Sequence, residues 1–405
     1  MHSHWRRNLF AVTAASFIGF TGFTLVMPFL PLYFKLLGVD DVGEIAMWSG
    51  LSLGVTPGLT AILAPFWGRL ADRYGRKIMV ERSLVSFVIV MGAMAYVQRP
   101  WHVFALRALQ GFFAGYGSLT LTMAADSAPR DRMAYAIGFV QTAQRLGPAI
   151  GPIVGGSVAQ IAGLRNAFLV TACFYLVAVL LVVFMYDEHR APHTVATKDE
   201  RVTFRSMLAF ENFILLMAVV FGLQFVDRSF GPVLPLFVAQ VGTPVSRVPI
   251  VAGVLFSIAA GTGAVGHHIC ARLLRRASPR RVIAVSAAIG SAGAFIYVLA
   301  TGPWLLVLGT PIFGIAIGIA TTAAYTAASS VMPASGRGAG FGLLTTASLA
   351  GLALSPIVNG ILGATSIRAV FMLDAVGLAS LAAIVSRLMI VAPMVSATAP
   401  ATEEI

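Results

Sequence analysis

Apolar segments long enough to cross a lipid bilayer follow one another along almost the whole sequence, and this feature limits the fold more than any other. A helix of about 20 residues spans a hydrocarbon core about 30 Å thick. Backbone groups in contact with lipid must satisfy their own hydrogen bonds, and barrel strands would alternate polar and apolar residues, which these segments do not do. The sequence therefore predicts an all-α membrane protein.

Twelve such segments can be distinguished, and we predict that each is a transmembrane helix. The first lacks the short apolar core and small-residue cleavage site of a secretory signal, so we expect it to be retained. The predicted spans are 8–36, 46–70, 78–98, 102–126, 134–162, 166–186, 209–240, 248–272, 281–300, 303–330, 338–363 and 367–391. Composition agrees, because 11% of the residues are charged, whereas soluble proteins contain about 25%.

The net charge of +12 at pH 7 would suit a nucleic-acid-binding surface if it were concentrated on one soluble face. Instead, most of the 28 Lys and Arg residues lie in the terminal segments and in the loops after even-numbered spans. Cytoplasmic loops of membrane proteins carry such an excess of positive charge. We therefore predict a multi-pass protein of the cell (inner) membrane with both termini in the cytoplasm and with no nucleic-acid partner.

The two halves of the chain resemble each other at a constant offset of 204 residues. Pro28 and Pro31 of the first span recur as Pro232 and Pro235 of the seventh. Seven residues of the fifth span recur in the same order in the eleventh. They are Thr142, Ala143, Gly147, Pro152, Ile153, Val154 and Gly156, which correspond to Thr346, Ala347, Gly351, Pro356, Ile357, Val358 and Gly360. Six spans per unit make this a parallel repeat, which places a substrate site between the halves near the midplane. We predict an N-terminal bundle (1–186), a cytoplasmic linker (187–208), a C-terminal bundle (209–391) and a disordered cytoplasmic tail (392–405).

The loop after the second span reads GRLADRYGRK, residues 68–77. Glycines allow a tight turn, an aspartate can cap a helix, and basic residues anchor the loop at the cytoplasmic face. The pattern resembles the signature of the major facilitator superfamily, and its matching positions are Gly68, Leu70, Asp72, Arg73, Gly75, Arg76 and Lys77. The resemblance implies a twelve-helix transporter built from two pseudo-symmetric six-helix bundles.

In that superfamily, an acid at the position of Asp72 caps the eleventh span of the other half when the protein is open outward. The arginine at the position of Arg76 pairs with an acid at the inner end of the fourth span, a place that Asp126 occupies here. The equivalent loop of the second half, residues 266–281, keeps its arginines but lacks the aspartate and the glycine pattern. We therefore expect one cytoplasmic gating loop rather than two.

The fourth span contains RALQGFFAG, residues 107–115. An arginine inside the bilayer is costly and normally faces a partner or a water-filled cavity. Resemblance to proton-coupled members of the superfamily implies a coupling role for Arg107, although a side chain that extends to the outer interface is the alternative. Gly111 and Gly115 form a GxxxG pair, which predicts close approach of another helix.

The fifth span carries a motif of small residues and prolines: Gly147, Pro148, Gly151, Pro152, Gly155 and Gly156. Small residues allow a neighbouring helix to approach closely, and each proline removes a backbone donor and bends the helix. The pattern resembles the antiporter motif of drug and proton exchangers in the superfamily, whereas ordinary helix packing is the alternative reading. In the repeated span, only Gly351, Pro356 and Gly360 remain of it.

Arg145 departs from the antiporter motif, which does not require a charge at that place. It follows Gln144 and lies about two helical turns before Pro152, in the inner half of the fifth span. The residue types allow two readings: an anchor for an anionic group of the substrate, or a structural tether paired with a carboxylate. The first reading predicts a preference for acidic or zwitterionic compounds over lipophilic cations.

The seventh span supplies the best-placed carboxylate, Asp227, which is followed by Arg228. Proton coupling requires a titratable group in a partly dry cavity. The alternative is an Asp–Arg pair that holds the two halves together. Asp374 of the twelfth span ranks second, and the first span, unlike that of some drug antiporters, has no acidic residue.

Several remaining residues carry weaker indications. Phe23 and Met27 belong to an aromatic and methionine-rich part of the first span that would suit an apolar drug cavity. His267 and His268 point to different sides of a helix, so we predict no metal site and expect both at the interface. Cys173 and Cys270 lie too far apart to indicate a disulfide framework.

These observations together predict a proton-coupled exporter, an antiporter of small molecules or drugs that works by alternating access. An inward-moving proton neutralises Asp227 and releases the substrate outward, and Arg107 and Arg145 tune the pKa of Asp227. The alternative is a proton-coupled uptake symporter. A non-transporting scaffold gains nothing from buried arginines, and no nucleotide loop or nucleophile–base pair indicates an enzyme or a cofactor. We expect a monomer whose partners are its substrate, protons and lipid.

Overall fold

The computed structural model describes residues 4–129, 132–188, 212–332 and 337–390, without the side chains of residues 4, 72, 134 and 337–339. All regular structure in the described part is helical, as predicted. The N-terminal helices are α1 (His4–Leu25), α2 (Leu30–Leu36), α3 (Val42–Tyr74), α4 (Arg76–Met94), α5 (Pro100–Phe113), α6 (Tyr116–Ser127), α7 (Met133–Ala162) and α8 (Leu164–Met185). The C-terminal ones are α10 (Phe213–Arg228), α11 (Leu234–Gln240), the short 3-10 helix Val245–Arg247, α12 (Val248–Leu273), α13 (Pro279–Leu299), α14 (Pro303–Val331), α15 (Arg337–Thr365) and α16 (Ile367–Leu388).

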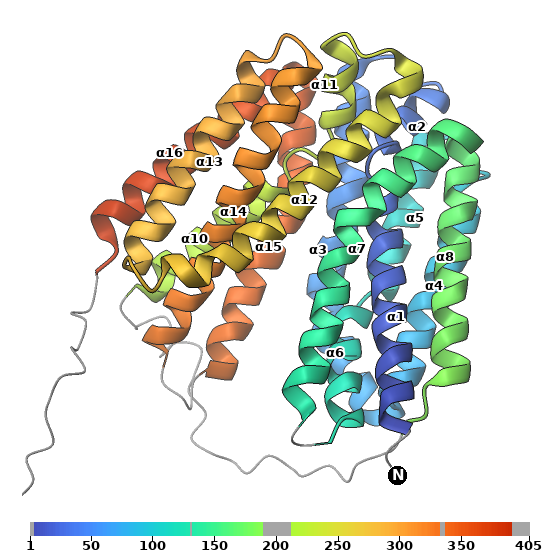
Figure 1. Cartoon of the computed structure of the whole chain (residues 1–405). Helices are drawn as coiled ribbons and strands as arrows, with labels where there is room; N and C mark the ends of the chain where they lie inside the picture. The colour runs from blue at the N-terminus through green and yellow to red at the C-terminus, as the bar shows by residue number, and fades with distance from the viewer. Residues whose placement is uncertain (1–3, 130–131, 189–211, 333–336, 391–405) are drawn as a thin grey trace, which may run out of the picture.

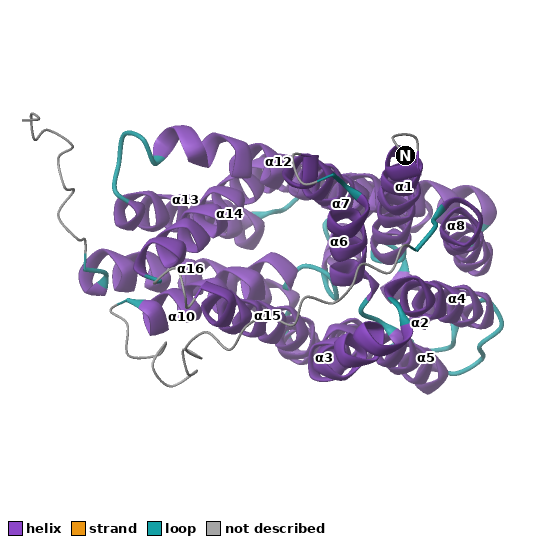
Figure 2. Ribbon diagram, turned by 90° about the horizontal axis from the view of Figure 1, so that it is seen from below, coloured by secondary structure: helices purple, strands orange, loops and turns teal. Residues whose placement is uncertain are grey.

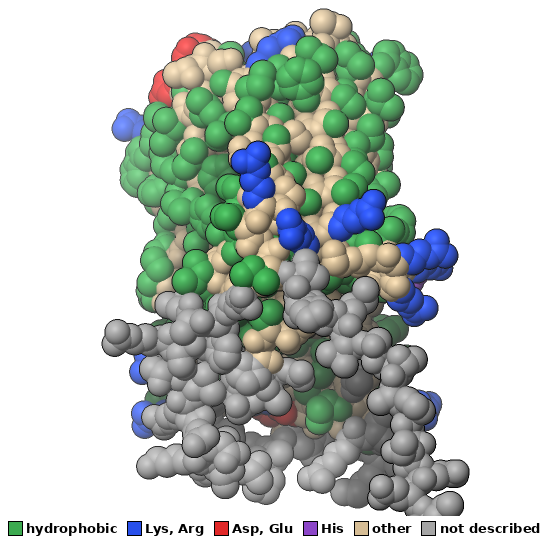
Figure 3. All heavy atoms as spheres, turned by 90° about the vertical axis from the view of Figure 1, so that its left-hand side faces the viewer, with side chains coloured by type: hydrophobic (Ala, Val, Ile, Leu, Met, Phe, Trp, Pro, Cys, Tyr) green, Lys and Arg blue, Asp and Glu red, His purple; other side chains and the backbone are tan. Residues whose placement is uncertain are grey.

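The helices form two bundles that stand side by side, one from α1 to α8 and the other from α10 to α16 (Figure 1). Eight helices of the described chain are long and apolar enough to cross a membrane. On the face shown in Figure 3, hydrophobic side chains cover most of the upper surface, and Lys and Arg side chains gather below them. Most of the predicted linker and the predicted tail lie outside the described residues, so these two assignments remain predictions.

Nine predicted spans correspond to single helices, but the first, fourth and seventh are each broken into two. The breaks at 26–29 and 229–233 are repeat-related, and Pro28 and Pro232 lie within them. Because proline has no backbone N–H and clashes with the preceding turn, it interrupts a helix at such a place. Each chain turns there and resumes as the short helix α2 or α11.

The break in the fourth span corrects the predicted GxxxG packing pair. Gly111 does pack closely, since a Cβ there would lie 2.5 Å from the carbonyl oxygen of Thr56. Gly115, by contrast, has φ of +120° and no neighbour within 4 Å of a Cβ, so it ends one helix and starts the next. Glycine adopts this backbone conformation without the steric cost that other residues meet.

Side chains from two neighbouring helices stabilise this break. Trp67 Nε1 donates to the carbonyl of Phe112 at 2.7 Å, and Ser83 Oγ donates to that of Phe113 at 2.7 Å. Arg82 also donates to the Phe113 carbonyl and stacks 3.4 Å from the Trp67 ring. Carbonyls freed at a helix end inside a membrane need such partners.

The two bundles meet along two seams, α3 with α15 and α7 with α12 (Figure 2). In the first seam, Gly50 lies against Pro356, and a Cβ at Gly50 would approach the Gly360 Cα to 2.8 Å. In the second, Gly253 lies against the carbonyl of Pro152, and Gly156 against that of Pro249. Both seams lie toward the face opposite the N-terminus, and the bundles separate toward the other face (Figure 1).

These contacts explain which positions the two repeats share. Gly147 packs on the backbone of Phe17 and Thr21 of α1, and Gly351 packs on that of the equivalent pair, Phe221 and Phe225 of α10. Pro152 with Pro356, and Gly156 with Gly360, occupy matching places in the two seams. The glycines that the two repeats share therefore have backbone neighbours that cannot move aside.

Candidate translocation site

Ionisable residues from both bundles lie near one another around His267 of α12. Arg145 of α7 and Asp227 of α10 both lie within electrostatic range of the imidazole of His267 on α12. His267 is half-buried, and its Nδ1 lies 2.7 Å from Thr322 Oγ1 of α14. The ring also bonds to the backbone of Gly318, one turn earlier on α14. Residues from four helices therefore converge here.

The position of His267 corrects the expectation that both histidines lie at the interface. His268 is exposed, but His267 is held against α14. Close backbone packing makes this possible, because a Cβ at Gly266 would meet the backbone of Ile315 and one at Gly318 would meet that of Gly263. Gly263 lies one turn before His267, and Gly266 lies one residue before it. These glycines were the sequence signal that could have predicted close packing of His267 on a neighbouring helix.

Arg145 lies near the middle of α7 and is exposed. Within the described part of the chain, its guanidinium forms no hydrogen bond or ion pair. The carboxylate tether that the sequence allowed is therefore not formed in this conformation. Gln144 differs, because its amide donates to the carbonyl of Gly117 at 2.9 Å and to Thr120 Oγ1 at 3.1 Å, which fixes α6 on α7.

Asp227 and Arg228 lie at the end of α10, immediately before the break in the seventh span. Their charged groups are 3.3 Å apart, and the side chains are 37% and 30% exposed. This pair joins neighbours in one helix, so the predicted role of a buried pair between the halves is wrong for this conformation. Asp227 is instead a partly exposed carboxylate within electrostatic range of His267.

Asp374 is fully buried inside the C-terminal bundle. One carboxyl oxygen accepts a hydrogen bond from Ser229 Oγ at 2.5 Å, and the other has no partner among the described residues. Phe371, one turn earlier on α16, packs on Phe230 and Tyr297. An ionised carboxylate with no cation in such surroundings would be very costly.

Arg107 is also buried, with only 2% of its surface exposed, so the alternative of a side chain that reaches the outer interface is wrong. Its Nη1 donates to Gln110 Oε1 at 2.9 Å, whereas Nε and Nη2 have no partner among the described residues. Its other electrostatic neighbour is Tyr175 of α8, in the same bundle. The contacts of Arg107 thus lie inside the N-terminal bundle rather than at Asp227.

The antiporter motif of α7 presents two faces. Gly147, Gly151 and Gly155 lie directly on the backbone of α1, where any Cβ would clash. Pro152 and Gly156 face α12 in the seam, and next to them the amide of Ile153 donates to Ser257 Oγ at 3.1 Å. Pro148 and Pro152 both lie within one continuous helix. Phe23 and Met27 lie half-buried at the end of α1 and in the break after it.

The loop between α3 and α4 holds a network of charges at the face that carries the N-terminus. Arg76 forms the ion pair with Asp126 that the resemblance implied. Arg73 lies over the ring of its neighbour Tyr74 at 5.4 Å. Gly68 has an open surrounding, and the side chain of Asp72 lies outside the described part, so its predicted cap on the eleventh span remains a prediction.

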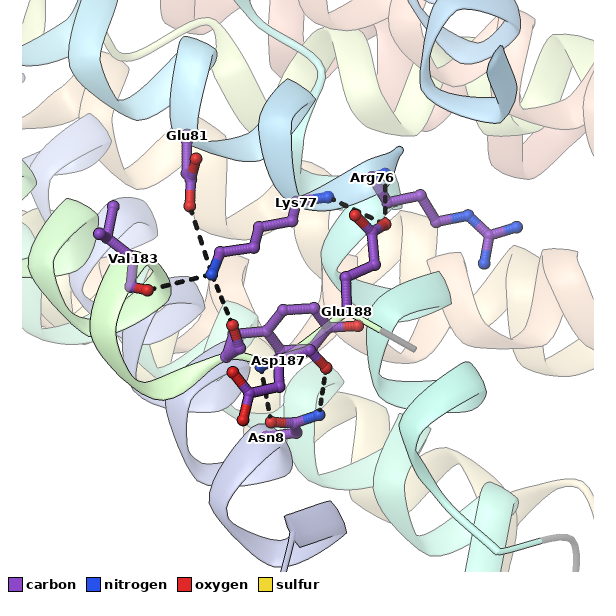
Figure 4. Close-up of polar contacts among 8 residues, drawn as sticks. Asn8, Arg76, Lys77, Glu81, Val183, Asp187 and Glu188 are labelled. Carbon is purple, nitrogen blue, oxygen red and sulfur yellow. Dashed lines mark hydrogen bonds and ion pairs between the residues drawn. The ribbon is translucent and has the colours of Figure 1, made fainter. Parts of the chain in front are cut away.

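The first residues after α8 join this network, as Figure 4 shows. Glu188 Oε1 accepts hydrogen bonds from the backbone amides of Arg76 at 2.7 Å and Lys77 at 3.3 Å. Lys77 Nζ donates to the carbonyls of Val183 at 3.0 Å and Tyr186 at 2.7 Å. Gly75, with φ of +105°, leaves room for Glu188. The capping of the α4 N-terminus by Glu188, which follows the last helix of this bundle, was not predicted from the sequence.

We expect Glu188→Ala to lower the thermal unfolding temperature of the purified protein. The change removes the acceptor for two free amides at the N-terminus of α4, a cap worth about 0.5–2 kcal/mol, and its negative charge at that helix end. Glu188→Gln, which keeps an acceptor oxygen, should lose less. Asp40→Ala, which removes an exposed acid elsewhere, is the control, and an equal effect of all three changes would contradict the capping role.

Comparison with known families agrees with this architecture. Residues 12–348 match the family model of the Major Facilitator Superfamily. A "Multi-drug resistance efflux pump PmrA homolog" from Lactococcus lactis is 30% identical over 378 residues, which cover 90% of this chain and 91% of that protein. A "Multidrug resistance protein MdtG" from Salmonella paratyphi A is 33% identical over 327 residues, 80% of each chain.

Solved structures share the fold at low sequence identity. A bacterial homolog of the human lysosomal transporter Spinster, in an inward-facing and occupied conformation, superposes with a TM-score of 0.79 at 17% identity, over 96% of this chain and 98% of that one. A D-xylose-proton symporter gives 0.75 at 14% identity, over 96% and 98%. The predicted family and twelve-span fold are therefore confirmed, and the protein is a multi-pass membrane transporter of small molecules. The chain belongs to the Major Facilitator Superfamily.

Proposed function

We propose that this protein is a proton-coupled antiporter that exports drugs or other small molecules by alternating access. The observation that carries the proposal is that Arg145 and Asp227, from opposite bundles, both lie within electrostatic range of His267 in the membrane-spanning helix α12. Ionisable groups are costly inside a membrane and usually line a passage. The similarity to a multi-drug resistance efflux pump homolog from Lactococcus and to a multidrug resistance protein from Salmonella supports export of drugs.

In this proposal, the protein lies in the inner membrane and the face that carries the N-terminus is cytoplasmic. The distribution of Lys and Arg supports this orientation. Residues 1–186 and 209–391 then act as two rigid units joined by the linker 187–208. In the conformation described, the seams are closed toward the outside and the bundles are apart toward the cytoplasm. Rocking of the bundles about the central site would open the seams and close the cytoplasmic side.

Proton coupling is assigned first to Asp227, because this carboxylate is partly exposed and lies within electrostatic range of His267. Arg107 and Asp374 are secondary candidates, since each is buried inside its own bundle and one or more of its polar atoms has no partner among the described residues. Substrate contacts are assigned to Arg145, Arg228, Gln144, Phe23 and Met27, which lie on α1, α7 and α10 or just after α1. Protons and the substrate are the expected partners, and a monomer is the expected working unit.

Everted membrane vesicles test this function directly. In vesicles that hold a proton gradient, addition of a transported drug should partly collapse the gradient, and only where the protein is present. Vesicles from cells that lack the protein are the control. A gradient that no drug affects, together with substrate accumulation in whole cells that make the protein, would reject export and favour uptake symport.

A further inference from the structure

We propose that the transported compounds carry a carboxylate, as acids or zwitterions, and that this group binds Arg145 in the space between α7 and α12. This inference rests on the proposed export function and specifies its substrate class. It assigns the free guanidinium of Arg145 as the group that selects the substrate.

The first support is that the guanidinium of Arg145 has no polar partner among the described residues. The other guanidiniums placed within the membrane-spanning helices are engaged: Arg82 bonds to the Phe113 carbonyl and stacks on Trp67, Arg107 bonds to Gln110, and Arg228 lies beside Asp227. Arg145 alone among these forms no hydrogen bond or ion pair within the described part of the chain. Because a charge without a partner is costly at this depth, a bound anion would relieve that cost.

The second support is the direction in which Arg145 faces. Its neighbours on α7 point into their own bundle, since Gln144 bonds to α6 and Gly147 packs on α1. Arg145 lies about two helical turns before Pro152 and therefore on the same face of α7, and the carbonyl of Pro152 packs on Gly253 of α12 in the opposite bundle. Arg145 also lies within electrostatic range of His267 on α12. Arg145 therefore faces the space between the bundles.

The third support is the balance of charge around that space. Arg145 and Arg228 supply two guanidinium groups, and Asp227 supplies one carboxylate. Positively charged groups therefore outnumber negatively charged ones by one, which favours an anionic group. A zwitterion could bind Arg145 through its carboxylate and place its amine toward Asp227. Because the two partners lie in different bundles, such a ligand would contact both.

The ligand chemistry follows from geometry as well as charge. A guanidinium offers several N–H donors in one plane, which match the two oxygens of a carboxylate. An ester of the same compound keeps its size and its apolar rings but loses the negative charge. Comparison of an acid with its own ester therefore isolates the contribution of Arg145.

The test uses the purified full-length protein and two dyes that share one ring system, rhodamine 110 with a free carboxylate and rhodamine 123 with a methyl ester. Binding is followed by fluorescence polarisation. We expect the wild type to bind rhodamine 110 more tightly, and Arg145→Gln to weaken that binding about tenfold or more while rhodamine 123 changes less than about twofold. Arg145→Lys should keep part of the preference. Arg272→Gln, an arginine at the end of α12, should change neither affinity.

Several results would overturn the inference: tighter binding of the ester, no binding of the acid, or an equal loss of both dyes in Arg145→Gln. A variant that does not fold is recognised by size-exclusion chromatography, and Arg145→Lys then supplies the comparison. The proposed function is tested separately, by whether either dye collapses the proton gradient in everted vesicles. Acid-selective binding without such a collapse would reject proton-coupled export and leave the carboxylate site standing.

Discussion

Vesicles that contain the Asp227→Asn variant are expected to show no drug-induced loss of the proton gradient, at the level of vesicles without the protein. Asparagine has the size of aspartate but cannot take up and release a proton. In a proton-coupled antiporter, one group must be charged in one half of the cycle and neutral in the other. Asp227 is the partly exposed carboxylate within electrostatic range of His267. Loss of this group should therefore remove coupling entirely.

The same variant should still exchange substrate with substrate, because that reaction needs no net proton movement. Counterflow of labelled drug in reconstituted vesicles measures this exchange and shows that the variant is folded. Asp40→Asn is the matched control, since Asp40 is an exposed acid in the loop before α3. A gradient that drugs still collapse in the Asp227→Asn variant would move the coupling role away from this residue, with Asp374 the next acid to test.

The helices could be predicted closely, because their cause is local. Length and hydropathy alone predict a helix over 134–162, and the structure has one over Met133–Ala162. The two proline breaks were not predicted as interruptions, although the repeat of Pro28 at Pro232 marked both places. The break at Gly115 could not be predicted, because what stabilises it is a set of side chains from other helices, Trp67 and Arg82 among them.

The candidate site could be predicted only in part. Arg145 and Asp227 stand out in the sequence because a charge inside an apolar span is costly wherever it points. His267 does not stand out, because its place depends on how closely α12 packs on α14. The capping role of Glu188 was missed for a similar reason. The helix that it caps begins at Arg76, 112 residues earlier in the sequence. Contacts between distant segments set these roles.

Gly50→Ala is expected to hold the protein away from the conformation described and to reduce drug transport strongly. The added Cβ would meet the backbone of Pro356 and lie 2.8 Å from the Gly360 Cα, and backbone atoms at a helix seam cannot move aside separately. Overpacking of this kind costs about 1–3 kcal/mol, comparable with the few kcal/mol that separate the conformations of a two-state protein. Gly58→Ala, on the same helix, is the control, since its Cβ would lie 3.6 Å from the Ala353 Cβ.

Opening of the seam can be measured at Ala46, which is fully buried and packs beside Gly363. A cysteine placed there, in a chain with Cys173 and Cys270 replaced by alanine, should react faster with an impermeant thiol reagent from outside when Gly50→Ala is present. Gly253→Ala makes the equivalent change in the other seam, against the carbonyl of Pro152. If the bundles rock as rigid bodies, either change must open both seams and expose Ala46→Cys alike. Continued protection of Ala46→Cys in the Gly253→Ala variant would mean that the seams separate independently, and rigid-body rocking would then be wrong.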